Sequence, residues 1–338
     1  MTDSSSKTAC TVAIIGSGPA GVGAALALHK AGIDDVVILE RDQEAGGVPR
    51  HCGHPPFGLR EYHRILAGPS YAARNIQAIT EAGIRLLTGH TVTRLGKGGS
   101  LDLVTSQGAR TIAAQRVLLA TGTRETPRAA RFVSGGRPLG ILNTGALQAM
   151  IYLKGMIPFR SPLVVGTELV SFSALWTCKK AGIRPVVMID EEKKAGVSRL
   201  VAMSHRYMGV PMLLGVEIIN IQGRDRVESV TIRDGNGAIR EFACDGVLFT
   251  GRFVPEASLA RLGDLCLDPA TGCPAVDSEG RCSDPAYFAA GNLVHAPVRV
   301  AGQCYRSGVQ AGLAIARDLG GRVHEKDCPI PPDRRKRT

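Results

Sequence analysis

The sequence contains no closely paired cysteines, and this limits its redox and metal chemistry. Nine cysteines are scattered through 338 residues, and no two of them form a Cys-x-x-Cys pair. The closest group, Cys266, Cys273 and Cys282, has spacings of seven and nine, which match no common zinc or iron–sulfur loop. We therefore expect reduced thiols, no zinc site and no iron–sulfur site.

Long apolar runs are also missing. A membrane helix needs roughly 18 consecutive apolar residues, and even the stretch 163–170 is interrupted by Gly166 and Glu168. Residues 1–10 lack the basic start and apolar stretch of a signal peptide. The sequence predicts no membrane span and a cytoplasmic location.

Aromatic residues make up only 4% of the chain, whereas the net charge is +11. A basic surplus suits nucleic acid, a membrane surface, phosphate-bearing ligands or acidic partners. Because single-strand binding usually adds stacking aromatics to a basic groove, nucleic acid is the disfavoured choice. We expect phosphate-bearing cofactors and an acidic protein partner, and a disordered basic tail over 326–338.

A glycine-rich loop near the N-terminus carries the clearest motif. An apolar strand is predicted over 11–15 and a helix up to about residue 31, with Gly16-x-Gly18-x-x-Gly21 between them and Glu40 after a second strand. The first glycine permits a tight turn, the second lets the backbone approach a pyrophosphate, and the third lets the helix pack on the strand. Glu40 would accept a hydrogen bond from a ribose hydroxyl, so the loop predicts a dinucleotide site.

The chain repeats itself after a shift of 150 positions, which aligns Gly166 with Gly16 and Asp190 with Glu40. This repeat explains the length as two related halves, and it predicts a second strand–helix–strand unit over 162–190.

The glycine motif has decayed in the second copy, which holds Glu168 at the middle position and Ser171 at the third. Glu168 would satisfy the positive end of the predicted helix itself and repel an anionic ligand. We expect this half to have lost ordinary NAD(P)H binding; an altered loop that still binds NAD(P)H is the alternative.

Further short motifs accompany the two glycine loops: Gly46-Gly47, Ala120-Thr121-Gly122, Gly251-Arg252 and Ala290-Gly291-Asn292 followed by a helix. With these motifs, residues 11–319 resemble the two-dinucleotide-binding-domain FAD-dependent oxidoreductases, a pyridine nucleotide-disulfide oxidoreductase-like superfamily, in the thioredoxin reductase-like size class. The resemblance implies an α/β fold with two Rossmann-like three-layer domains, the second inserted in the first. It places a discontinuous FAD domain at 8–140 and 252–325, and the second domain at 141–251.

The resemblance also implies that the first half binds FAD. Gly46 and Gly47 would lie near the pyrophosphate and flavin, Val92 beside the adenine, and Gly291 and Asn292 near the ribityl chain and pyrophosphate. Asn292 stands where the family usually has Asp, which removes a charge but keeps a hydrogen-bonding group. The full set of expected FAD contacts is Gly16, Gly18, Pro19, Ala20, Gly21, Glu40, Arg41, Gly46, Gly47, Val48, Val92, Ala120, Thr121, Gly122, Gly291, Asn292, Gly302 and Gln303.

Disulfide reductases of this superfamily carry a cysteine pair, but the two corresponding regions here hold one cysteine each, Cys52 and Cys178. Disulfide reduction is therefore not expected. The segment 46–58 looks more like FAD subunits of heteromeric amino-acid, opine, hydroxy-acid or glycerol-3-phosphate-type dehydrogenases. If this loop follows the path it takes in the family, His51, Cys52 and His54 would lie near the flavin and are candidate catalytic residues. The alternative is a loop in which the histidine and the buried thiol have only a packing role.

Three functions follow from these observations. The favoured one is the FAD subunit of a heteromeric dehydrogenase that oxidises a small amino acid, amine or hydroxy compound. Its expected partners are a companion flavoprotein and a small iron–sulfur subunit. The second is a self-sufficient NAD(P)H-dependent flavin oxidoreductase. The third is a noncatalytic subunit that binds an adenine nucleotide, for which the second domain offers a place.

Overall fold

The computed structural model describes residues 8–295 and 300–321 and divides the chain into two compact units. Unit 1 takes its residues from 1–49, 56–124 and 254–338, and unit 2 consists of 50–55 and 125–253. The second unit is thus an insertion in the first. The predicted tail at 326–338 lies outside the described residues.

Unit 1 is built on a seven-stranded sheet with the order β3-β2-β1-β6-β5-β4, and β17 pairs with β6 beside this row. Strands β1, β2, β3 and β17 run parallel to their neighbours, whereas β4, β5 and β6 form an antiparallel meander. The long strand β6 belongs to both parts of the sheet. The bounds are β1 (Thr8–Ile15), β2 (Val36–Leu39), β3 (Arg85–Leu87), β4 (Thr91–Leu95), β5 (Ser100–Thr105), β6 (Gly108–Leu119) and β17 (Tyr287–Ala289).

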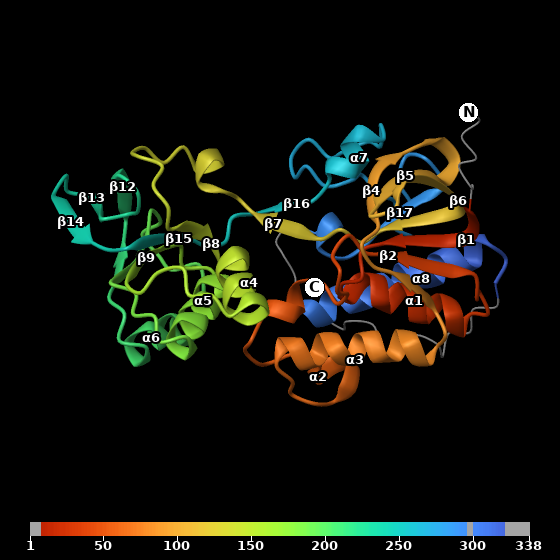
Figure 1. Cartoon of the computed structure of the whole chain (residues 1–338), viewed down its shortest axis with the longest axis horizontal. Helices are drawn as coiled ribbons and strands as arrows, with labels where there is room; N and C mark the ends of the chain where they lie inside the picture. Colours follow the sequence, from red (N-terminus) through yellow and green to blue (C-terminus); the bar gives the residue numbers. More distant parts are fainter. Residues whose placement is uncertain (1–7, 296–299, 322–338) are drawn as a thin grey trace, which may run out of the picture. The chain divides into compact units, whose positions relative to one another are not determined.

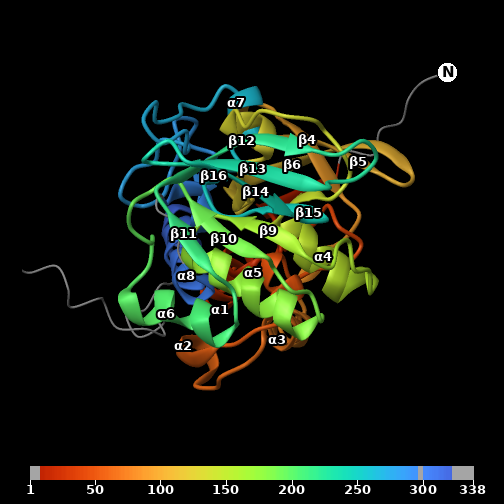
Figure 2. The ribbon, with the colours of Figure 1, turned by 90° about the vertical axis from the view of Figure 1, so that its left-hand side faces the viewer.

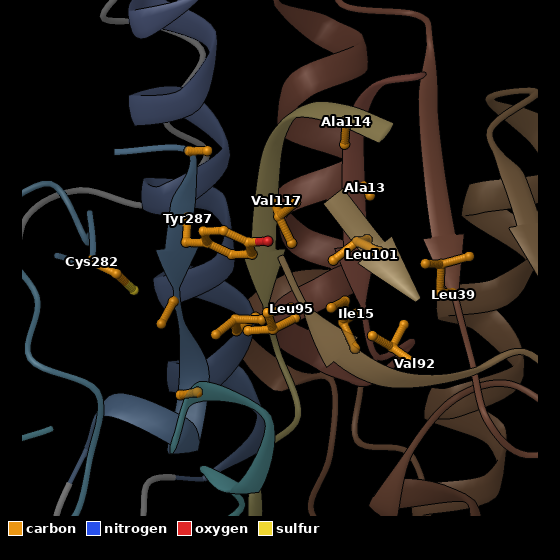
Figure 3. Packing of buried hydrophobic residues seen from close by; sticks show 14 of the residues in the cluster. Ala13, Ile15, Leu39, Val92, Leu95, Leu101, Ala114, Val117, Cys282 and Tyr287 are labelled. Atoms are coloured by element: carbon orange, nitrogen blue, oxygen red, sulfur yellow. The ribbon is translucent and has the colours of Figure 1, made fainter. Parts of the chain in front are cut away.

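The side chains of β1 alternate between two buried clusters, one on each face of this sheet. Val12 and Ile14 pack with the helices on one face, which Figure 1 shows beside the sheet. Ala13 and Ile15 point to the other face, where the meander strands and Tyr287 close a second apolar cluster (Figure 3). The helices of unit 1 are α1 (Pro19–Lys30), α2 (Leu59–Tyr62), α3 (Gly68–Glu81), α7 (Ser258–Leu262) and α8 (Ala301–Asp318), with 3-10 turns η2 (Lys97–Gly99) and η4 (Gly291–Val294). The 3-10 turn η1 (Val48–His51) begins in unit 1 and ends in unit 2.

Helices α1 and α8 cross at unusually short range because glycines line their contact. A Cβ built on Gly308 would overlap the carbonyl oxygen of Ala20, and one on Gly312 would lie 2.6 Å from the carbonyl oxygen of Ala24. From the other side, a Cβ on Gly23 would overlap the carbonyl of Tyr305. The backbones therefore touch, and the first turn of α1 is fixed against the C-terminal helix.

Unit 2 repeats the three-layer design with a five-stranded parallel sheet in the order β11-β10-β9-β15-β8. Figure 2 shows helices on one side of this sheet and the antiparallel sheet β12-β13-β14 on the other. Two buried clusters fill the spaces between these layers. The bounds are η3 (Arg128–Arg131), β8 (Ile141–Asn143), α4 (Thr144–Lys154), β9 (Pro162–Val165), α5 (Leu169–Lys180), β10 (Val187–Asp190), α6 (Arg199–Tyr207), β11 (Met212–Leu214), β12 (Val216–Gln222), β13 (Ser229–Asp234), β14 (Ile239–Ala243) and β15 (Gly246–Phe249).

The chain passes between the units along two short strands, β7 (Thr123–Glu125) and β16 (Phe253–Pro255), which pair with each other. The first crossing comes earlier than the boundary expected at 140. Residues 125–140 belong to unit 2 because buried polar groups tie them there: Glu125 accepts from the backbone N–H groups of Gly145 and Gly251 at 2.8 and 3.0 Å. No helix among residues 8–295 and 300–321 is long and apolar enough to cross a membrane.

Candidate nucleotide-binding and redox site

The three glycines of the first loop meet the three requirements read from the sequence. Gly16 has φ +108, and a Cβ there would lie 2.6 Å from the carbonyl oxygen of Ala120. A Cβ on Gly21 would overlap the carbonyl oxygen of Gly16, so only glycine allows α1 to pack this close to β1. A Cβ on Gly18 would meet no atom within 4 Å. The middle glycine therefore faces open space at the start of α1.

Glu40 closes the loop from the second strand. Its carboxylate is buried and accepts hydrogen bonds from the backbone N–H of Ser17 at 3.1 Å, from Ser17 Oγ at 2.5 Å and from the Asp42 N–H at 3.0 Å. Ser17 Oγ in turn accepts from the backbone N–H of Gly46 at 2.9 Å. We call this arrangement of acid, hydroxyl and glycine the loop clamp. It leaves Glu40 with about one of its roughly four acceptor positions for a ribose hydroxyl.

Several other expected contact residues lie against the same helix start. A Cβ on Gly47 would lie 2.8 Å from the Cα of Gly18, and one on Gly291 would lie 2.7 Å from the Cβ of Ala20. The glycine loop, the loop after β2 and the 3-10 turn η4 thus meet at the N-terminus of α1. The structure brings together Gly16, Gly18, Pro19, Ala20, Gly21, Glu40, Gly46, Gly47, Ala120 and Gly291 in this way.

The remaining expected FAD residues lie elsewhere in unit 1. Val92 is buried on β4 and packs in the meander cluster, as Figure 3 shows. Arg41 follows β2 on the surface, and Val48 begins the turn η1 with 58% of its surface exposed. Gly302 and Gln303 form the first turn of α8, and a Cβ on Gly302 would lie 2.7 Å from Glu61 Oε1. Thr121 and Gly122 follow β6, and Asn292 lies in η4.

The helix start itself fits a diphosphate group. Gly18 is the N-cap of α1 and no side chain caps this helix, so its first backbone N–H groups are available to an anion. Open space in front of Gly18 would admit the diphosphate, and Glu40 has an acceptor position left for the attached ribose. The residues present therefore suit FAD.

Unit 2 contains the same loop clamp 150 residues later. Thr167 Oγ1 donates to Asp190 at 2.5 Å and accepts from the Gly196 N–H at 3.1 Å, while the Glu192 N–H donates to Asp190 at 3.0 Å. Gly166, with φ +115, repeats the turn of Gly16. The sequence analysis missed the hydroxyl and glycine partners, although the 150-residue shift aligns Ser17 with Thr167 and Gly46 with Gly196.

The two copies differ at the middle glycine position, where Glu168 is the N-cap residue of α5. Its carboxylate accepts the backbone N–H of Arg252 at 2.8 Å, and its Cγ would lie 3.7 Å from a Cβ on Gly196. The expectation that Glu168 satisfies the end of its own helix needs correction, because it makes no side-chain cap to α5 and instead binds the loop after β15. Its charge nevertheless lies beside the helix start.

The two copies also differ at the third position. Ser171 is fully buried, and its hydroxyl lies 2.6 Å from Thr250 Oγ1. Ser171 therefore replaces the third glycine without leaving its buried hydroxyl unpaired.

The proposed catalytic residues His51, Cys52 and His54 lie in the segment that belongs to unit 2. Cys52 is buried, and its Sγ lies 3.6 Å from Gln148 Oε1. The carbonyl of Gly53 accepts a hydrogen bond from Lys180 Nζ at 2.7 Å. His54 Nδ1 lies 2.9 Å from the carbonyl oxygen of Pro55. Burial, and to a lesser degree the nearby Glu125 carboxylate, raises the pKa of the Cys52 thiol to about 12.

We predict that Cys52 resists alkylation in the native protein. At pH 8 a thiol of pKa about 12 holds almost no thiolate, which is the nucleophilic form, and its burial also blocks access. Cys266 is exposed and serves as the internal control. Mass spectrometry after timed iodoacetamide treatment should show Cys266 modified at least roughly tenfold faster than Cys52. Equal rates at the two cysteines would contradict the buried position of Cys52.

The described part of the chain shows no metal centre: no three His, Cys, Asp or Glu side chains within it form a group that could hold an ion. All eight cysteines in that part are free thiols. Cys178 lies buried in α5, and burial raises the pKa of its thiol to about 12. Apart from the exposed Cys266, these cysteines are therefore packed as apolar groups rather than presented as reactive pairs.

Comparison with known proteins agrees with this geometry. A family model described as pyridine nucleotide-disulphide oxidoreductase matches residues 10–312. The chain belongs to this family. Pyridine nucleotide-disulphide oxidoreductases of this kind are FAD-dependent oxidoreductases with two Rossmann-like domains, so the fold class and the FAD-dependent enzyme class predicted from the sequence are confirmed.

Individual family members show similarity at modest identity. One opine oxidase subunit from Rhizobium meliloti (strain 1021) is 27% identical over 64% of this chain and 49% of that protein. The biphenyl dioxygenase system ferredoxin–NAD(+) reductase component of Paraburkholderia xenovorans (strain LB400) is 29% identical over 87% of this chain and 69% of that protein. The chain therefore spans about half to two thirds of these curated relatives. The crystal structure of T. acidophilum thioredoxin reductase superimposes with a TM-score of 0.78 at 21% identity, covering 93% of this chain and 100% of that chain.

Proposed function

We propose that this chain is the FAD-containing subunit of a heteromeric electron-transferring dehydrogenase, in which a small amino acid, amine or hydroxy compound is oxidised. One observation carries the proposal: the start of α1 is open at Gly18, whereas the equivalent position of unit 2 holds Glu168, whose carboxylate accepts the Arg252 N–H. A flavin bound in unit 1 would then receive electrons from a source other than NAD(P)H bound in unit 2. The name of one relative, which is a subunit of opine oxidase, supports a multi-subunit context.

In this proposal the chain's own residues hold the cofactor and tune its surroundings. The backbone N–H groups at the start of α1 bind the diphosphate, and Glu40 orients the ribose through its remaining acceptor position. Bound FAD supplies the redox chemistry by accepting and releasing electrons. His51, Cys52 and His54 remain candidates for contacts to the flavin. Cys52 would act there as a neutral thiol, since its pKa lies far above neutral pH.

Helix α6 offers support for a protein partner. Leu200, Met203 and Tyr207 recur at helical spacing and are 84%, 56% and 75% exposed, so they form an apolar stripe on the surface of unit 2. Arg199 and Arg206 lie on the same helix, and Lys179 Nζ lies 4.0 Å from the centre of the Tyr207 ring. An apolar stripe with basic neighbours suits a companion protein with an acidic rim. The proposed partners are a companion flavoprotein and a small iron–sulfur subunit.

The decisive test is anaerobic mixing of the FAD-loaded protein with excess NADH or NADPH. We expect the yellow absorption of oxidised flavin to persist, because the Glu168 carboxylate would repel the diphosphate of NAD(P)H at the start of α5. Chemical reduction with dithionite serves as the control that the flavin is reducible. Rapid bleaching by either nicotinamide cofactor would overturn the proposal, and affinity purification of the tagged chain from its native host should recover the companion subunits.

A second candidate is a self-sufficient NAD(P)H-dependent flavin oxidoreductase. The retained Asp190 and Thr167 clamp in unit 2 favours it, as does the name of the ferredoxin–NAD(+) reductase relative. The same mixing experiment separates the two, since this candidate requires fast flavin reduction. The noncatalytic alternative, a subunit that binds an adenine nucleotide, would purify without yellow colour.

A further inference from the structure

Unit 2 contains a pocket that combines the loop clamp with a carboxylate, that of Glu168, at the helix start. Its volume is about 230 Å3, below the roughly 300–1,000 Å3 of pockets for larger ligands. Its lining includes Gly166, Thr167, Glu168, Asp190, Val216 and Ile218, all within unit 2. A small ligand therefore fits better than a whole dinucleotide.

Three hydrogen bonds of the unit 1 clamp recur in the half of the loop that would bind a nucleoside: hydroxyl to acid, backbone N–H to acid, and glycine N–H to hydroxyl. Asp190 accepts from Thr167 and from the Glu192 N–H, which leaves about two of its roughly four acceptor positions for a pair of neighbouring hydroxyls. The clamp therefore retains the acceptors that a ribose needs.

The backbone beyond the clamp is also repeated. The Gly215 N–H donates to the Glu192 carbonyl at 3.0 Å, as the Gly89 N–H donates to the Asp42 carbonyl at 2.9 Å in unit 1. Ile218 on β12 follows Gly215 by three residues, as Val92 on β4 follows Gly89, so the two residues are equivalent. Ile218 lines the pocket. An apolar wall for a planar base is thus present.

The charges around the pocket disfavour phosphate. Four carboxylates line it, those of Glu168, Asp190, Glu191 and Glu192, against two guanidinium groups. Both guanidinium groups are engaged by the protein: that of Arg131 donates to the carbonyl oxygens of Thr126, Thr250 and Gly251, and that of Arg252 to Glu191 at 2.6 Å. The Glu168 carboxylate also lines the pocket at the N-cap of α5, where it accepts the Arg252 N–H at 2.8 Å.

We propose that this pocket binds a purine nucleoside without a phosphate group and that Glu168 selects against nucleotides. Asp190 would accept hydrogen bonds from the ribose 2′- and 3′-hydroxyls, and Ile218 and Val216 would contact the base. The inference rests on the proposed function in one respect, since both take Glu168 as the barrier to a dinucleotide. It narrows the ligand of unit 2 from an adenine nucleotide to a nucleoside.

Isothermal titration calorimetry of the FAD-saturated protein tests the proposal, with adenosine, 2′-deoxyadenosine, AMP and NAD+ as the probes. Adenosine should bind saturably and about tenfold or more tightly than AMP and NAD+, because each phosphate meets the Glu168 carboxylate. Loss of the 2′-hydroxyl should weaken binding by a similar factor. Saturating FAD keeps the probes away from the site in unit 1.

Two variants assign the effect to the named side chains. Glu168→Gln keeps the size and removes the charge, so AMP should gain roughly tenfold in affinity while adenosine changes little. Asp190→Asn should lower the affinity for adenosine. Circular dichroism checks that this variant is folded. The proposal is overturned if adenosine does not bind, if AMP or NAD+ binds as tightly as adenosine to the unaltered protein, or if Glu168→Gln leaves the preference unchanged. Failure of adenosine to bind would overturn this inference alone, whereas the proposed function is tested by flavin reduction with NADH or NADPH.

Discussion

The Gly18→Glu variant is expected to purify as a folded protein without FAD. Gly18 has φ −70 and ψ −179, a conformation open to any residue, and a Cβ there meets no atom within 4 Å. The new carboxylate would enter the space where the diphosphate of FAD meets the start of α1. Two like charges about 4 Å apart repel by about 4 kcal/mol near a protein surface, which is roughly a thousandfold in affinity. The ratio of flavin to protein absorbance after gel filtration measures the loss.

Gly18→Gln is the matched control for this prediction, because it has the same size without the charge. It should bind FAD more weakly than the unaltered protein but more tightly than Gly18→Glu. Circular dichroism and thermal unfolding of the two variants, both without FAD, should coincide. Stoichiometric FAD in purified Gly18→Glu would mean that the diphosphate does not lie at this helix start.

The Gly308→Ala variant should lose about 3 kcal/mol or more in the free energy of unfolding. The added methyl group would overlap the carbonyl oxygen of Ala20 and lie 2.8 Å from its Cα, so the helices α1 and α8 must separate. Neither atom belongs to a flexible side chain that could move aside. Because Ala20 lies in the first turn of α1, the displacement should also weaken FAD binding. Urea unfolding followed by circular dichroism measures the first effect, and flavin release measures the second.

Gln310→Ala provides the control on the same helix, since Gln310 is exposed and faces away from the crossing. It should change the unfolding free energy by less than about 0.5 kcal/mol. Equal stability of Gly308→Ala and Gln310→Ala would show that the helix crossing can relax, contrary to the backbone contact described above.

The first strand–helix–strand unit was predictable because its signals are local. The glycine spacing, the apolar strands and Glu40 all fall within about thirty residues, and the structure places α1 and β2 where these signals indicate. The sequence also predicts a helix from Tyr71 to a glycine cap at Gly83. This helix, α3, is present but begins at Gly68, with Pro69 in its first turn. The stretch 43–70 is rich in glycine, proline and histidine, which predicts a long loop, but it contains η1 and the short helix α2.

Other features depend on contacts that no local pattern reveals. The sequence analysis did not identify α4, whose only buried residues are Thr144, Leu147 and Gln148, so its apolar side chains form no single stripe. The sequence does contain signals for the two ends of this helix. Asn143 caps its N-terminus by accepting from the Ala146 N–H, and Gly155 caps its C-terminus. Likewise, the assignment of 125–140 to unit 2 depends on hydrogen bonds of Glu125 and Arg131 to residues more than a hundred positions away.

The loop clamp has a consequence for how such proteins diverge. In both units the acidic residue at the end of the second strand accepts from the hydroxyl of the glycine loop and from the backbone N–H two positions further on, and the hydroxyl accepts from a glycine N–H. This holds whatever stands at the middle glycine position. The carboxylate therefore stabilises the loop even when no ligand is bound. A protein that has lost its cofactor during evolution still needs this carboxylate to keep the shape of the loop. An acid at this position is evidence of ancestry, and the residue at the middle of the glycine motif is the better indicator of what is bound today.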